Sequence, residues 1–264
     1  MIIVAGGDSF IWGSELADCS DGSNNGYSRN TFTALLSKDY EYQCAAYPGN
    51  ANDSIARMTV NACEKNKGKK QAVLVSWTFP GRYEFNIQTT QGQRWEVINS
   101  WSVGKQYTNA DDIDKNTVVD LFKNKADLLG IGKFAESYFA NVGFLEYWEV
   151  YTSLKEIVYL QNYLIVNNIS YLFTCADNGI FNSYTLNNPD DTIQSLYNQI
   201  NFDNWYFFPA GTQANETQAP RGFYQWAVEN KYIMGPEGHP LEDAHRDAAL
   251  LIKEKFNELV KKSI

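Results

Sequence analysis

The chain begins with the stretch IIVAGGDSFIWG, residues 2–13, and this stretch decides the fold. Its β-branched run predicts a buried strand, and Gly6-Gly7 followed by Asp8-Ser9 predicts a tight turn at the end of that strand. In open α/β sheets, ligand sites lie outside the carboxyl ends of the strands. The turn therefore presents the Ser9 hydroxyl where chemistry is expected, although the same residues could simply link a strand to a loop.

The elements that follow predict a doubly wound α/β fold. Residues 41–47 and 71–77 read as strands, and the helix expected between them, 52–65, has its apolar residues at helical spacing. The third strand is apolar without alternation, as is typical of parallel strands covered on both faces. Further elements are expected at 170–176 and 204–208 (strands four and five) and at 117–128, 133–167, 189–200, 222–229 and 241–262 (helices).

We therefore predict a three-layer α/β/α sandwich with a parallel sheet of about five strands. The 264 residues are assigned to a single domain, 1–264, with an insertion at about 83–168 that holds a β-hairpin and extra helices. Alternation over 83–88 and 94–99 predicts the hairpin. The acidic segment 112–123 resembles a calcium-binding loop but has Thr and Lys at the positions that need Gly and Glu, so we interpret it as a solvated helix start.

Composition excludes several classes of partner. The net charge of −9 argues against nucleic acid, because phosphate binding needs a basic stripe. Two histidines and four scattered cysteines argue against a metal site and indicate free thiols. No signal peptide or membrane span is recognised, so a cytoplasmic location without membrane contact is expected, and a virion component would look the same. The oligomeric state stays open.

The two histidines lie close together near the C-terminus. His239 comes just before the last expected helix, with Pro240 at a helix-start position and Glu237 two residues earlier. A histidine with a neighbouring acid is the arrangement of a base and the group that orients it. His245 lies inside the helix and is interpreted as a packing residue.

Together these blocks resemble the SGNH (GDSL-type) hydrolase superfamily over essentially the whole chain. The matching blocks, in order, are Gly7-Asp8-Ser9-Phe10, then Pro48-Gly49 with Asn52-Asp53, then Gly238-His239-Pro240. The stretch from Trp77 to Arg82 is also similar to phage- and polysaccharide-associated branches of that superfamily.

The resemblance implies a set of roles. Ser9 would be the nucleophile and His239 its base, with Glu237 as the orienting acid. The backbone N–H groups of Ser9 and Gly49, with the side chain of Asn52, would stabilise the oxyanion. No metal and no organic cofactor is implied.

Two departures from the family pattern leave alternatives open. The family's acid stands three residues before the histidine, where this chain has Pro236, so Glu237 would have to substitute. The family's oxyanion Asn follows the third strand, where this chain has Ser-Trp-Thr-Phe. The third donor could instead be Asn52, Thr78 or Arg82.

The sequence thus predicts a serine esterase that hydrolyses an O-acyl ester, such as an O-acetyl group, on a small molecule or carbohydrate. The residues expected to bind substrate are Asp8, Trp12, Trp77, Thr78 and Arg82. Aromatic side chains near the expected site loops would stack on sugar rings, or could belong to the core instead; besides the two tryptophans just named they are Tyr83, Trp95 and Trp101. The alternative is a binding or structural protein that keeps the fold without catalysis. A nucleotide site fares worse, since no glycine-rich phosphate motif is present.

Overall fold

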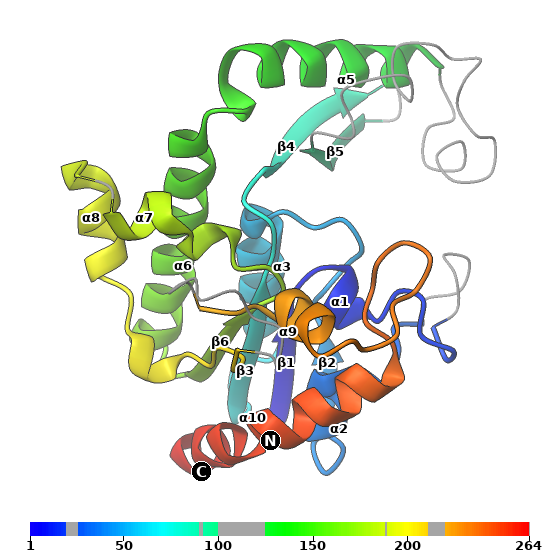
Figure 1. The fold of residues 1–264 in the computed structure, drawn as a ribbon, viewed down its shortest axis with the longest axis vertical. Helices are drawn as coiled ribbons and strands as arrows, with labels where there is room; N and C mark the ends of the chain where they lie inside the picture. Colours follow the sequence, from blue (N-terminus) through cyan, green and yellow to red (C-terminus); the bar gives the residue numbers. More distant parts are fainter. Residues whose placement is uncertain (20–25, 90–91, 100–124, 188, 211–219, 264) are drawn as a thin grey trace.

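A four-stranded parallel sheet forms the centre of the computed structural model (Figure 1). The structure describes residues 1–19, 26–89, 92–99, 125–187, 189–210 and 220–263. The strands stand in the order β2 (Glu41–Cys44), β1 (Ile2–Gly6), β3 (Gln71–Trp77) and β6 (Ser170–Cys175). The first strand of the chain is therefore central, and its C-terminal end lies between those of its neighbours. The α/β fold class expected from the sequence is confirmed.

Both faces of this sheet are buried, which explains the continuous apolar runs of its strands. Successive side chains of a strand point to opposite faces. Val4 and Val73 accordingly pack into one core, and Ile3 and Leu74 pack into a second core on the other face. All four side chains are fully buried.

Helices cover the two faces as separate layers (Figure 1). One layer consists of α3 (Asn52–Lys65) and α6 (Glu146–Val166), which pack on each other. The opposite core includes side chains from α2 (Phe32–Leu36), α9 (Phe223–Glu229) and α10 (Glu242–Ser263). No helix among the described residues has both the length and the apolar character needed to cross a membrane.

The β-hairpin is present as expected. β4 (Arg82–Thr89) pairs with β5 (Gly92–Asn99) in antiparallel register, and Figure 1 shows the hairpin beyond the C-terminal ends of the sheet strands. Tyr83 and Ile98 anchor it in a small core with Phe139. The segment 112–123 and Trp101 lie outside the described residues. The single-domain organisation stays a prediction.

The long helix expected over 133–167 is divided. It consists of α5 (Lys125–Tyr138), a π-helical turn η2 (Phe139–Gly143), and α6. The turn closes on itself at Gly143, where a Cβ atom would lie 2.6 Å from the Phe139 ring. The chain then leaves helical geometry at Leu145, whose φ and ψ are extended. Most of the helix expected over 117–128 lies outside the described residues.

The fifth strand expected over 204–208 is not formed. A short 3₁₀ helix, η4 (Phe202–Asn204), precedes a single bridge in which Trp205 pairs with Phe173 of β6. The Tyr206 N–H donates to the Phe173 carbonyl at 2.8 Å, and the pairing ends there. The aromatic run reflects burial of Trp205 against Phe173 and Phe181, with ring centroids 5.5 and 5.1 Å away, rather than a ladder of strand residues.

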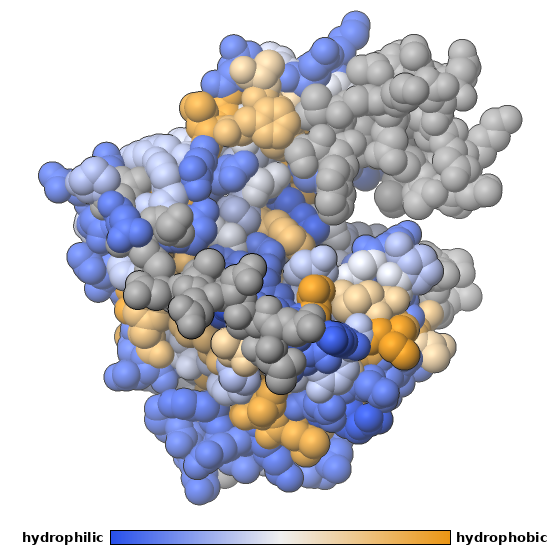
Figure 2. Space-filling model, viewed as in Figure 1, coloured by the Kyte–Doolittle hydropathy of each residue, from blue (hydrophilic) through white to orange (hydrophobic). Residues whose placement is uncertain are grey.

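The remaining described elements are short, except for the amphipathic helix α8. They are α1 (Ser9–Trp12), η3 (Gly179–Phe181), α7 (Ser183–Asn187) and α8 (Asp191–Asn198). The face of the molecule in Figure 2 is largely hydrophilic, with separate groups of hydrophobic side chains over α5, over α10 and over the segment that joins α9 to α10. Leu250 and Leu251 are the exposed leucines of α10.

Candidate active site

Ser9 stands at the C-terminal end of the central strand, in the first turn after β1. Asp8 caps this turn by accepting the Phe10 N–H at 3.0 Å, and α1 begins at Ser9 itself. The turn needs glycine at position 7, because a Cβ there would lie 2.3 Å from Cγ1 of Ile11. The local sequence thus fixes the hydroxyl at the sheet edge where α/β proteins place their sites.

His239 meets Ser9 from the other end of the chain. Its Nε2 lies 2.8 Å from Ser9 Oγ, across 230 positions of sequence. The imidazole ring also packs against Phe10, with ring centroids 5.2 Å apart. The loop that carries His239 is closed by its own carbonyl, which accepts the Gly235 N–H at 2.7 Å. The serine and histidine are therefore within hydrogen-bond reach, as a nucleophile and its base must be.

The acid beside His239 is Glu15, and the expectation of Glu237 is corrected. Glu15 Oε2 lies 2.6 Å from His239 Nδ1 and also accepts the His239 backbone N–H at 3.2 Å. The Glu237 side chain is exposed, and that residue contributes its backbone N–H, which donates to Glu15 Oε1 at 2.9 Å. Glu237 therefore helps to hold the acid through its backbone N–H, and its own carboxylate is not the acid that contacts His239.

The environment of Glu15 favours its ionised form. Burial alone would raise the pKa of this carboxyl, but hydrogen bonds from the Glu237 N–H and from His239 outweigh burial and lower the pKa below its ordinary value. An ionised carboxylate accepts a hydrogen bond and therefore favours the imidazole tautomer that carries its proton on Nδ1. In that tautomer the lone pair of Nε2 faces Ser9. The three side chains thus form a chain of contacts from carboxylate to imidazole to hydroxyl.

Backbone features far from each other in sequence place Glu15. Its φ of 67° lies in the left-handed region, which a non-glycine residue adopts at a cost and which here turns the chain back toward the histidine loop. Gly235 leaves room for the carboxylate, since a Cβ at that position would lie 2.5 Å from Glu15 Oε2. Neither feature is marked by a motif, so the sequence gives only the fact that an acid follows Ser9 by six residues.

Two backbone donors belong to the turn of Ser9 and to the loop after β2. The N–H groups of Ser9 and Gly49 have no acceptor among the described residues. Gly49 adopts a φ of 80° in the loop after β2. Asn50, which the sequence analysis did not single out, ties that loop to β1, because its side-chain Nδ2 donates to the Gly7 carbonyl at 2.9 Å.

Asn52 does not have the free amide expected of an oxyanion donor. Its Nδ2 donates to the Thr78 carbonyl at 3.2 Å and to Ser153 Oγ at 3.0 Å, and its Oδ1 accepts the Thr78 N–H at 2.9 Å. Both ends of the amide are therefore occupied in joining the start of α3 to the end of β3. This is a correction to the role given to Asn52.

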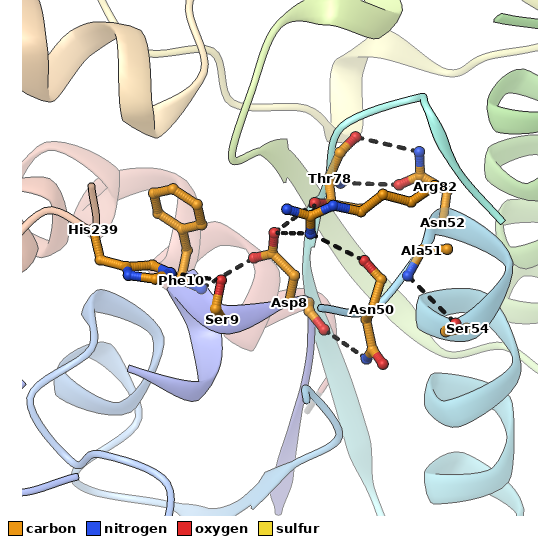
Figure 3. A network of polar contacts seen from close by, with 11 residues as sticks. Asp8, Ser9, Phe10, Asn50, Ala51, Asn52, Ser54, Thr78, Arg82 and His239 are labelled. Atoms are coloured by element: carbon orange, nitrogen blue, oxygen red, sulfur yellow. Dashed lines mark hydrogen bonds and ion pairs between the residues drawn. The ribbon is translucent and has the colours of Figure 1, made fainter. Parts of the chain in front are cut away.

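Asp8 and Thr78 form a buried polar network instead of a substrate surface. Both are fully buried, and the Thr78 hydroxyl donates to Asp8 Oδ2. Arg82 contacts the same carboxylate oxygen at 3.2 Å through Nη1 (Figure 3). The expectation that Asp8 and Thr78 contact substrate is thus corrected, because neither residue has surface exposed to solvent.

The expected aromatic residues separate into two groups. Trp77 is fully buried with its ring 5.4 Å from Phe173, so it belongs to the core and the expectation of a substrate contact is corrected. Tyr83 is likewise buried, whereas Trp95 is half exposed on the hairpin. Trp12 is partly exposed and contacts Tyr47, whose ring is half exposed 5.4 Å away. Tyr47, which the sequence analysis did not single out, precedes Gly49 by two residues.

The other histidine and the cysteines take no part in the contacts that join Ser9, His239 and Glu15. His245 is buried in α10, accepts the Phe32 N–H at its Nδ1, and has its pKa lowered to about 3 by burial and by the charge of His239. This agrees with its interpretation as a packing residue. The four cysteines are free thiols, as expected. Within the described part of the chain, no three His, Cys, Asp or Glu side chains are grouped to hold a metal ion.

Comparisons with known proteins give matches only at the level of solved structures. No family model and no curated protein matches the sequence. The chain is similar to the psychrotrophic esterase EstA from Pseudoalteromonas sp., with 12% identity, a TM-score of 0.43, and coverage of 99% of this chain and 97% of that one. It is also similar to a carbohydrate esterase described as having divergent catalytic and non-catalytic binding functions, with 13% identity, a TM-score of 0.44, and coverage of 100% and 70%.

Proposed function

We propose that this protein is a serine ester hydrolase in which Ser9, His239 and Glu15 act together. The observation that carries the proposal is the continuous series of contacts at 2.8 Å between Ser9 and His239 and at 2.6 Å between His239 and Glu15. Serine is a weak nucleophile at its ordinary pKa and needs an adjacent base that a third group orients. All three parts are present at the carboxyl end of the central strand.

The reaction proceeds in two halves. In the first, Ser9 Oγ attacks the ester carbonyl carbon while its proton passes to His239 Nε2, and the tetrahedral intermediate forms. The alcohol leaves as His239 returns that proton to the departing oxygen. In the second, water attacks the acyl carbon while its proton passes to His239 Nε2, and His239 then returns that proton to Ser9 Oγ as the carbon–Oγ bond breaks and the carboxylic acid leaves.

The Ser9 and Gly49 N–H groups supply two donors for the oxyanion of each intermediate. Such donors act because they are fixed before charge develops on the oxygen. The anchor from Asn50 to the Gly7 carbonyl keeps the loop of Gly49 joined to the strand that ends before Ser9. This arrangement supports acyl transfer over simple binding.

The substrate we propose is an O-acyl ester on a carbohydrate, with O-acetyl as the smallest case. Trp12 and Tyr47 support this choice, because they form an aromatic pair between α1, which begins with Ser9, and the loop after β2, which carries Gly49. Partly exposed aromatic rings bind the apolar faces of other rings and retain a polar edge for water.

The test is intact mass after incubation with a fluorophosphonate, which reacts only with an activated serine. We expect one adduct on the wild type, located on Ser9, and none on Ser9→Ala or His239→Ala. Ser14→Ala is the matched control, because Ser14 lies on the same loop and we expect its variant to react normally. A folded wild type that forms no adduct would refute the esterase and favour a non-catalytic binding protein, to be followed by glycan binding measurements.

Once an adduct is found, acetate release from acetylated mono- and oligosaccharides should be compared with release from an activated aryl acetate. Preference for the sugar esters supports the carbohydrate assignment. Equal or lower efficiency on every sugar would contradict that assignment and leave the esterase in place.

A further inference from the structure

The guanidinium group of Arg82 lies where three parts of the site meet (Figure 3). Its Nη1 is 3.2 Å from Asp8 Oδ2, 3.3 Å from the Asn50 carbonyl and 3.1 Å from Thr78 Oγ1. Asp8 precedes Ser9, Asn50 follows Gly49, and Thr78 is the first residue after β3. One nitrogen therefore contacts the residue before Ser9, the residue after Gly49, and the segment after β3 in which SGNH hydrolases have their oxyanion Asn.

Arg82 also holds donors that are not engaged. A guanidinium has five N–H donors, and those on Nε and Nη2 have no acceptor among the described residues. The side chain is only 9% exposed, and its charged end lies 4.8 Å from the ring centroid of Phe79, which limits its movement. A buried arginine with spare donors is thus fixed beside the nucleophile turn.

Among the three candidates for the third oxyanion donor, Arg82 alone has donors to spare. The Asn52 amide is occupied by Thr78 and Ser153. The single proton of the Thr78 hydroxyl is donated to Asp8. Counting the hydrogens on each side chain therefore leaves Arg82 as the one of these three candidates that has an unused donor.

The surrounding charges indicate what kind of group Arg82 would meet. Asp8 is fully buried and pairs with Arg82, so the pair is neutral overall. Asp177 lies close enough that its pKa, raised chiefly by burial, is raised further by Asp8 and lowered by Arg82. Glu15 adds a third carboxylate near Ser9. A permanently anionic ligand would be repelled here, whereas a carbonyl oxygen acquires negative charge only during the reaction.

We propose that Arg82 is the third oxyanion donor, through Nε or Nη2, and that the ester at the reacting centre is uncharged. The inference rests on the proposed esterase function. When Ser9 Oγ bonds to the carbonyl carbon, the carbon–oxygen π electrons move to the oxygen, and Arg82 donates a hydrogen bond to it without releasing a proton. The electrons return as the alcohol leaves with the proton from His239.

The discriminating variant is Arg82→Lys. A lysine ammonium has three donors, which can satisfy Asp8, Asn50 and Thr78 and leave none for substrate. We expect the fold and the melting temperature to be nearly retained, while the rate of Ser9 phosphonylation falls about 10²–10³-fold, the usual effect of losing one such donor. For ester hydrolysis, the loss should fall on kcat with KM nearly unchanged.

Arg82→Ala tests the same role by rescue. Guanidinium ion, added below the concentration that unfolds the protein, should restore part of the phosphonylation rate in this variant and leave the wild type unaffected. The matched control is Arg57→Gln, because Arg57 also pairs with a buried carboxylate, Glu84, and packs on an aromatic ring, Trp95. We expect that control to react within about threefold of wild type.

The outcomes separate the two proposals. A wild type that does not label at Ser9 refutes the esterase and this inference together. Labelling in the wild type with a normal rate in Arg82→Lys refutes the donor role alone. A rate loss in Arg82→Ala that guanidinium does not restore, accompanied by a lowered melting temperature, would assign Arg82 a structural role and also refute the inference.

Discussion

Replacing the proposed acid, Glu15, tests most directly whether Glu15 or Glu237 orients His239. The change is Glu15→Gln, which keeps the size of the side chain and removes its charge. In the structure this carboxylate accepts three hydrogen bonds, from the Glu237 N–H at 2.9 Å, the His239 N–H at 3.2 Å and His239 Nδ1 at 2.6 Å. Gln has a single acceptor oxygen, so its NH₂ group must face either the two His239 donors or the Glu237 N–H, and its amide carries no charge to offer the imidazole.

The expected loss follows from these contacts. A hydrogen bond to a charged group contributes about 1.5–3 kcal/mol, and this one strengthens when His239 becomes protonated. An NH₂ group that faces one of these donors leaves that donor without an acceptor and removes roughly another 1–2 kcal/mol. Together they raise the barrier by about 2.5–5 kcal/mol, which slows acylation by roughly 10²–10⁴-fold.

The assay is the rate of Ser9 phosphonylation together with hydrolysis of an activated aryl acetate. Glu237→Gln is the matched control, since it makes the same chemical change in an exposed side chain, and its rates should stay within about twofold of wild type. The reasoning is refuted if Glu237→Gln loses as much activity as Glu15→Gln, or if Glu15→Gln reacts normally while folded.

Three further predictions test the surroundings of the site. Gly235→Ala places a Cβ about 2.5 Å from the Glu15 carboxylate, so phosphonylation should slow by about 10–10²-fold with the melting temperature nearly retained; Gly130→Ala, where a Cβ meets no atom within 4 Å and the backbone lies outside the left-handed region, controls for loss of a glycine. His245 has its pKa lowered to about 3, so the unfolded chain binds a proton at a higher pH than the folded chain does. Chemical denaturation should therefore show that this residue removes about 2 kcal/mol from the free energy of unfolding as the pH falls from about 7 to about 5. His245→Gln, measured at both pH values, should lack that part of the decrease. An equal pH dependence in the variant would contradict this assignment. Trp12→Ala should raise KM for an acetylated sugar about 3–10-fold and leave an aryl acetate unchanged, whereas Trp95→Ala on the hairpin should affect neither; the sugar-stacking role fails if both substrates respond alike.

The parts of this fold that the sequence predicts are those in which local pattern and burial agree. The strand residues Val73 to Val75 face two cores in turn, so their run lacks polar residues and reads directly as a buried parallel strand. The apolar spacing of α3 likewise follows from packing on that sheet. Residues 204–208 are also rich in apolar side chains, but they make one bridge to the sheet, at Trp205, and a second to Arg221, at Phe208. Aromatic residues are common both in strands and in buried segments that are not strands, so composition does not separate the two.

The site divides in the same way. Ser9 and His239 each follow a local signal, a turn after a strand and a loop before a helix, and parallel topology brings such ends together. Glu15 has no such signal, because its position depends on its own left-handed backbone and on the space left by Gly235 across the chain. The expectation for Trp77 is wrong for a related reason: Trp77 is the last residue of its strand, and its ring is buried against Phe173 on the neighbouring strand.

The buried carboxylate of Asp8 explains why an acid stands directly before the proposed nucleophile. Its Oδ1 caps α1 at the Phe10 N–H, and its Oδ2 accepts from Thr78 after β3 and from Arg82 at the start of β4. A fully buried charge is unfavourable unless it is paired and hydrogen-bonded, and here every partner belongs to a different segment at the sheet edge. Asp8 therefore fixes the turn of Ser9 relative to the side chain that we assign to the oxyanion. Because this role needs no contact with substrate, the acid and the serine are adjacent for reasons of structure as well as chemistry.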